Sequence, residues 1–133
     1  MVFKITSDVP EKMYEGLFIT YKISPFLGIQ LDWCTEITHV KDKSFFVDEQ
    51  RVGPYKLWHH EHHFKEIDEG VEMIDIVSYE PPFGILGKLA DKLFLKKYMT
   101  ELLSERNRIV KEFAESDKWK ELINEKSTVY NNV

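Results

Sequence analysis

The sequence has a single cysteine, so no disulfide can form within the chain. It also lacks a surplus of positive charge, because 23 Asp and Glu residues against 18 Lys and Arg residues give a formal net charge of -5. This balance argues against a general nucleic-acid-binding protein, which needs excess cations to displace counterions from phosphates. No apolar run approaches the roughly 18 residues of a membrane span, and the first residues lack the basic region and long apolar stretch of a signal peptide. We therefore expect a reduced, cytoplasmic protein with no stable membrane insertion.

The 133 residues are 43% hydrophobic and 14% aromatic, which is enough for one packed core and too much for a disordered chain. The sequence has no internal repeat and no linker rich in Pro, Gly or Ser. We predict one domain over residues 1–126 and a frayed tail over residues 127–133.

Up to about Pro82 the chain is rich in β-branched and aromatic residues that turn-forming residues separate. Closely spaced segments of this kind predict strands of an antiparallel meander. The expected strands are residues 3–6, 17–23, 30–40, 44–52, 55–67 and 71–79.

From Leu86 to Phe113 the apolar residues recur at spacings of three, four and seven, which predicts a long amphipathic helix with a break near Ser116. The basic edge of this helix, Lys88 to Lys97, is expected to be a solvated face. The predicted fold class is α+β: a curved antiparallel sheet of about six strands, wrapped around the C-terminal helix so that both apolar faces are buried. Since a twisted sheet closes imperfectly on a cylinder, we expect a cavity between them.

One part of the sequence carries a long motif, whose elements are Gly53-Pro54-Tyr55, Trp58/His60/His62/Phe64, Asp75/Val77/Tyr79 and Pro82-Phe83-Gly84-Ile85-Leu86-Gly87. This motif resembles the START-like SRPBCC superfamily (the helix-grip fold), and in particular its bacterial ligand-binding and polyketide-cyclase-type branch. The resemblance covers roughly residues 1–113. It implies a small hydrophobic ligand held between sheet and helix, and it leaves the identity of that ligand open.

The family usually opens with an extra strand and two short helices, whereas this chain starts at what resembles the second strand. An incomplete sheet edge can pair with another chain, so we expect a homodimer formed through that edge.

Side chains alternate across a strand, so Trp58, His60 and His62 share one face, which we assign to the cavity. The matching faces of the other strands complete an aromatic wall with a polar patch, as is typical of a small-ligand site. The predicted ligand-binding residues are Trp33, Thr35, Phe46, Asp48, Gln50, Trp58, His60, His62, Asp75, Tyr79, Phe83 and Leu86.

Two interpretations of the polar patch stay open. In the first, His60 and His62, oriented by Asp48 or Asp75, hydrogen-bond the carbonyl or hydroxyl group of a ligand. In the second, the same residues form a buried network that holds the sheet together; this interpretation is slightly favoured for Asp75.

Binding without catalysis is the favoured function, with transport or sequestration as forms of it. The alternative is a cyclase-like or dehydratase-like enzyme that uses His60 or His62 as acid and base and Asp48 to orient it. No nucleophile–base pair and no cofactor motif accompanies these residues, so no cofactor is expected. A third class is an interaction protein with a vestigial cavity.

Four histidines and Glu61 within five residues also suggest zinc. However, alternation divides the histidines into two pairs on opposite faces of the strand. Each face is then short of ligands for a closed tetrahedral site, so no metal is expected.

Overall fold

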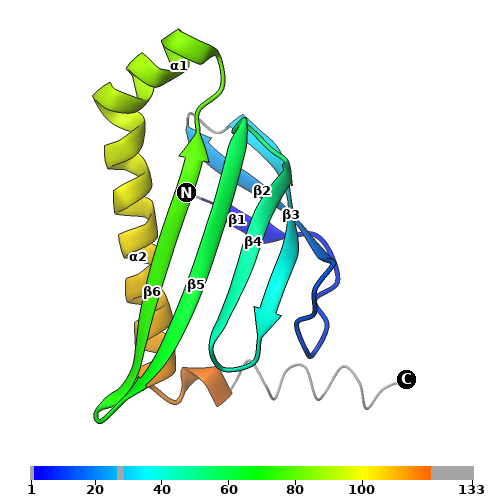
Figure 1. The fold of residues 1–133 in the computed structure, drawn as a ribbon, viewed down its shortest axis with the longest axis vertical. Coiled ribbons are helices and arrows are strands. Elements are labelled where there is room, and N and C mark those ends of the chain that lie inside the picture. Colours follow the sequence, from blue (N-terminus) through cyan, green and yellow to red (C-terminus); the bar gives the residue numbers. More distant parts are fainter. Residues whose placement is uncertain (1, 27–28, 121–133) are drawn as a thin grey trace. The chain divides into compact units, whose positions relative to one another are not determined.

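The computed structural model describes residues 2–26 and 29–120 (Figure 1). Its elements are β1 (Val2–Ile5), β2 (Leu17–Phe26), β3 (Ile29–Lys41), β4 (Phe45–Val52), β5 (Leu57–Ile67), β6 (Gly70–Glu80), α1 (Gly84–Ala90), the π-helical segment η1 (Asp91–Leu95) and α2 (Lys96–Glu115). The chain forms two compact units, residues 1–88 and residues 89–133, and each is described by itself. The wrapping of the sheet around the helix stays a prediction, and the expected tail over residues 127–133 lies outside the described residues.

The six strands form one antiparallel sheet in the order β1-β2-β3-β4-β5-β6, so each strand pairs with its neighbours in sequence. This is the predicted meander (Figure 1). The turns between β3 and β4 and between β5 and β6 are short, and each contains a residue with positive φ: Lys43 has φ 56°, and Gly70 at the start of β6 has φ 149°, a conformation that glycine adopts without strain. Short turns fix the register, and the register decides which side chains share a face.

Strand β2 is longer than predicted. The expected end at Pro25 rests on the missing N–H of proline, which cannot donate to a neighbouring strand. In the structure β2 continues to Phe26, and the pairing with β3 shifts register between Ile23 and Phe26. A bulge of this kind is where a strand accommodates proline.

The predicted C-terminal helix is present, and it begins at Gly84 and ends at Glu115. Ser116 terminates it in an extended conformation (φ -114°, ψ 173°), which confirms the expected break. The periodicity gave no sign of η1, where the helix widens to a π turn and the Lys96 N–H donates to the Asp91 carbonyl. In the described part of the chain, no helix combines the length and the apolar character that crossing a bilayer requires.

Close backbone approach explains the glycine at residue 87, in the first turn of α1. A Cβ atom at Gly87 would overlap the Pro82 carbonyl oxygen, so any side chain there must displace backbone. Phe83 and Gly84 both adopt positive φ, 64° and 54°, which turns the chain sharply out of β6. Glycine at residue 87 therefore fixes how the helix begins.

Candidate functional site: an aromatic face with a His–Asp cluster

The register of β3 to β6 places the predicted site residues of the strands on one face of the sheet, called here the histidine face. Residues paired directly across two strands point to the same side. The pairs that define this face are Thr35↔Gln50, Asp48↔His60, Phe46↔His62, Trp58↔Tyr79 and His62↔Asp75. The prediction from alternation is confirmed for these residues, while their role in binding stays a prediction.

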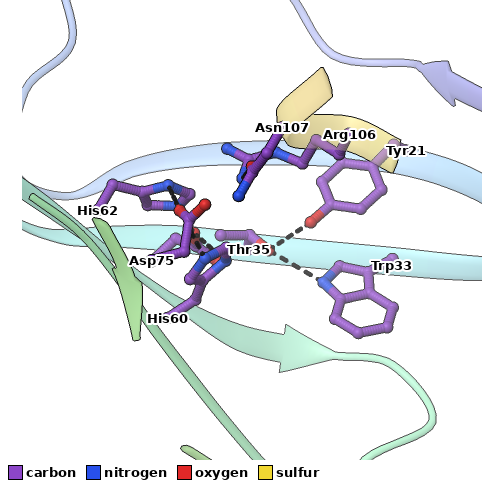
Figure 2. A network of polar contacts seen from close by, with 9 residues as sticks. Tyr21, Trp33, Thr35, His60, His62, Asp75, Arg106 and Asn107 are labelled. Carbon is purple, nitrogen blue, oxygen red and sulfur yellow. Dashed lines mark hydrogen bonds and ion pairs between the residues drawn. The ribbon is translucent and has the colours of Figure 1, made fainter. Parts of the chain in front are cut away.

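Four ionisable side chains meet at the centre of the histidine face. Asp48 Oδ2 lies 2.7 Å from His62 Nε2 and 3.5 Å from His60 Nδ1. On the other side, Asp75 Oδ1 lies 2.9 Å from His62 Nδ1 and 3.1 Å from His60 Nε2. Figure 2 shows the Asp75 carboxylate against both imidazole rings. Each carboxylate therefore contacts both histidines, and we call these four residues the His–Asp cluster.

The His–Asp cluster is almost completely removed from water, with side-chain exposures of 4% for His62, 6% for Asp75, 7% for His60 and 13% for Asp48. Taking charged groups out of water costs several kcal/mol per ion, and close partners offset that cost only in part. Such clusters add little net stability to a fold. A buried cluster of this kind in an aromatic surface is therefore a candidate functional site.

Aromatic rings surround the cluster. Phe46 stacks on His62 with ring centroids 4.0 Å apart, and Trp58 meets His60 edge-on at 6.2 Å. Trp58 also contacts Trp33 edge-to-face at 5.3 Å and packs near Tyr79 at 6.2 Å. These side chains come from β3, β4, β5 and β6, so the face is mostly apolar around one polar centre.

Thr35 joins a second polar group to this face. Its hydroxyl accepts a hydrogen bond from Trp33 Nε1 at 3.0 Å and lies 2.8 Å from the hydroxyl of Tyr21 (Figure 2). Thr35 is 3% exposed, so this hydroxyl satisfies the buried indole N–H and positions the Trp33 ring.

Three predicted binding residues have other contacts or positions. The side-chain amide of Gln50 donates to the Tyr55 carbonyl at 2.6 Å and accepts from the Tyr55 N–H at 3.2 Å, so it holds the turn between β4 and β5. Phe83 and Leu86 are 85% and 75% exposed, and they are not gathered into the histidine face. Their place in a ligand site stays a prediction.

The opposite face of β5 carries the other two histidines, each in contact with a glutamate. His59 Nδ1 lies 2.9 Å from Glu49 Oε1, and His63 Nε2 lies 2.8 Å from Glu61 Oε2. The hydrogen bond from His59 lowers the pKa of Glu49, to which Arg51 adds, and the hydrogen bond from His63 lowers the pKa of Glu61. These histidines are 33% and 38% exposed, in agreement with the expectation that this face is solvated.

Two hollows are described in the strand unit, of about 390 Å³ and 230 Å³. The larger is lined by Glu49, Gln50, Arg51, Lys56, Leu57, Trp58, His59 and Ser78, and the smaller by Met13, Val40, Lys41, Asp42, Lys43, Ser44, Phe45, Phe46 and Phe64. Neither includes a member of the His–Asp cluster. The histidine face is therefore a candidate binding site because of its chemistry and its burial, and not because of a hollow.

Sequence reasoning missed Tyr21 as a member of the histidine face. Tyr21 pairs with Trp33 across β2 and β3, so the two side chains lie on the same side of the sheet. Alternation along β2, in which Leu17, Ile19, Tyr21 and Ile23 share a side, was the signal that could have placed the tyrosine.

The architecture is similar to the crystal structure of TTHA0849 from Thermus thermophilus, with a TM-score of 0.53 and 18% sequence identity over 76% of this chain. The likeness is one of fold. The chain spans 65% of the length of that protein. No family model matches the sequence, and no curated protein matches it.

Proposed function

We propose that the protein binds a small, largely apolar molecule with a carbonyl or hydroxyl group on the histidine face. One observation carries the proposal: a buried His–Asp cluster stands in the middle of a wall of aromatic rings. Small-molecule sites combine apolar and aromatic walls with a few convergent polar groups that fix the orientation of the ligand. Aromatic rings supply contact area at low entropic cost, and the cluster supplies the polar end.

The motif resemblance supports the same proposal. The α+β layout, the six-stranded meander and the C-terminal helix agree with the START-like helix-grip family, in which a hydrophobic ligand is the implied occupant. Assignment of the chain to that family is part of the proposal, as are a cytoplasmic location and a role in carrying or sequestering the ligand.

A second candidate function is acid–base catalysis of the cyclase or dehydratase kind. The specific observation in its favour is the contact of 2.7 Å between His62 Nε2 and Asp48 Oδ2. A carboxylate that holds one ring nitrogen fixes the orientation and tautomer of the imidazole, as general acid–base catalysis requires.

The binding site can be tested with a matched pair of variants on β6. Val77 lies on the histidine face opposite His60, and Ile76 next to it lies on the other face, where it is exposed. We expect Val77→Trp to fill the site and abolish saturable, one-to-one binding of the fluorescent apolar probe 8-anilinonaphthalene-1-sulfonate. Ile76→Trp should leave that binding intact. Equal binding by both variants would refute the proposal.

His62→Gln separates the two candidate functions, because the catalytic candidate rests on the contact of His62 with Asp48. Glutamine keeps a hydrogen-bonding amide but cannot serve as an acid or base near neutral pH. A binding protein should keep its affinity for the probe and change only its preference among ligands. An enzyme should keep its affinity and lose turnover of a cyclisable or dehydratable substrate.

A further inference from the structure

We propose that the His–Asp cluster is a binding site for a divalent first-row transition-metal ion, held by Asp48, His60 and His62. This inference goes beyond the proposed function and does not depend on the organic ligand. It rests on three observations: the donor atoms, their mutual distances, and the position of Asp75 behind the two imidazoles.

The donor set and its spacing suit such an ion. Two imidazole nitrogens and one carboxylate oxygen, one from each residue, all lie within 4.8 Å of one another. Ligands placed 2.0–2.2 Å from a tetrahedral zinc ion are about 3.3 Å apart. The contacts from Asp48 Oδ2 to His62 Nε2 and to His60 Nδ1, 2.7 and 3.5 Å, bracket that value. Small side-chain rotations therefore convert the cluster into a coordination shell.

Asp75 supplies the outer support that metal-ligating histidines commonly have. Its Oδ1 faces His60 Nε2 and His62 Nδ1, the two ring nitrogens that point away from Asp48. When the ion takes the lone pairs of the other two nitrogens, each neutral imidazole has one N–H left, and both can donate to Asp75. A carboxylate in this position fixes the ring orientation and raises the basicity of the ligand.

The charge of the cluster also suits an ion. Asp48 and Asp75 bring two carboxylates to the two imidazoles, and carboxylates only accept hydrogen bonds. A divalent cation beside Asp48 balances the charge of the two carboxylates while both imidazoles are neutral, with one ring nitrogen of each on the ion and the other N–H donating to Asp75.

The sequence-based expectation that no metal binds considered only the ligands that β5 supplies. The sheet adds Asp48 from β4 and Asp75 from β6 to the same face, because these residues pair directly with His60 and His62. Three protein ligands leave coordination positions open, as in catalytic rather than closed structural zinc sites. An ion there could polarise the carbonyl of a bound molecule.

The test begins with the wild-type chain and Zn²⁺ alone. After treatment with a chelator, we expect one equivalent of Zn²⁺ to bind in competition with a chromophoric chelator, and Co²⁺ to give visible absorption bands of low-symmetry coordination. Long-range ¹H–¹⁵N spectra of the imidazoles should show coordination at His60 Nδ1 and His62 Nε2. Absence of one-to-one binding, or coordination at other histidines, overturns the proposal without any variant.

Variants then assign the ligands. Asp48→Asn and His62→Gln should each abolish one-to-one binding, whereas Asp75→Asn should weaken it by about 10–100-fold, because Asp75 acts through the histidines. The control is the double variant His59→Ala/His63→Ala on the opposite face, which should bind Zn²⁺ as the wild type does. A greater loss in Asp75→Asn than in Asp48→Asn, or loss of binding in the control, overturns the assignment. Circular dichroism in the presence of chelator establishes that each variant is folded.

Discussion

Removal of one carboxylate from the His–Asp cluster should destabilise the fold, although the cluster as a whole adds little stability. Asp48→Ala takes away the acceptor that lies 2.7 Å from His62 Nε2 and 3.5 Å from His60 Nδ1. A charge-assisted hydrogen bond contributes about 1.5–3 kcal/mol, and breaking a buried pair from one side costs about 3–5 kcal/mol in total, because the remaining group stays buried without a partner.

The matched variant removes both members of the pair. In Asp48→Leu/His62→Leu, apolar side chains fill the space, and the contact of 3.1 Å between His60 and Asp75 remains. Replacement of buried ion pairs by hydrophobic residues of similar volume is often neutral or stabilising by about 1–4 kcal/mol. We therefore expect the double variant to be at least about 2 kcal/mol more stable than Asp48→Ala.

Urea unfolding followed by tryptophan fluorescence measures both effects, because Trp33 and Trp58 lie in the aromatic wall beside the cluster. The buffer should contain a chelator so that bound metal does not add to the stability. For a chain of this length a loss of about 3 kcal/mol lowers the melting temperature by about 10 °C. A double variant as unstable as Asp48→Ala would show that the cluster is a structural network and would refute the functional interpretation.

Three further outcomes are expected. Gly87→Ala should lower the free energy of unfolding by at least about 2 kcal/mol, measured by chemical denaturation, because the new Cβ would overlap the Pro82 carbonyl. At a helical site without such an obstruction, alanine would raise the stability by about 1 kcal/mol relative to glycine. A more stable variant would therefore contradict the close approach. The pKa of Glu49 is lowered by His59, so its stabilising contribution is present above pH 4.5 and is lost as the pH falls through the lowered folded value. Glu49→Gln should therefore be slightly less stable than wild type at about pH 6 and equal to it in strong acid, and a gap that persists in acid would contradict this linkage. Light scattering should show a dimer formed through a sheet edge, and a monomer at all concentrations would contradict that prediction.

The sheet was predictable because its signals are local. Turn residues divide the first part of the chain into segments of strand length, and short connections between them allow only an antiparallel meander. Alternation then placed Trp58, His60 and His62 on one side, and the register of β4 and β6 brought Asp48 and Asp75 to that side as expected. The two-residue period of a strand directly predicts which side chains share a face of the sheet.

The other features of the fold and site depend on side-chain conformations and strand pairing, which the pattern of residues along the chain does not specify. Gln50 lies two residues after Asp48 and is expected on the same face of β4, yet its side-chain amide forms hydrogen bonds with the backbone of Tyr55 in the turn. The contacts of each carboxylate with both imidazoles arise from side-chain rotamers across three strands, which alternation along a strand does not specify. The register shift near the end of β2 is a feature of the pairing between two strands, and the pattern of β2 alone does not contain it.

Native mass spectrometry of the freshly purified protein tests the central claim most directly. We predict a stoichiometric, noncovalent small molecule on the wild type and on Ile76→Trp, released by acid and missing from Val77→Trp. The bare polypeptide mass for the wild type, or the same adduct on Val77→Trp, would contradict the claim that the histidine face is a binding site.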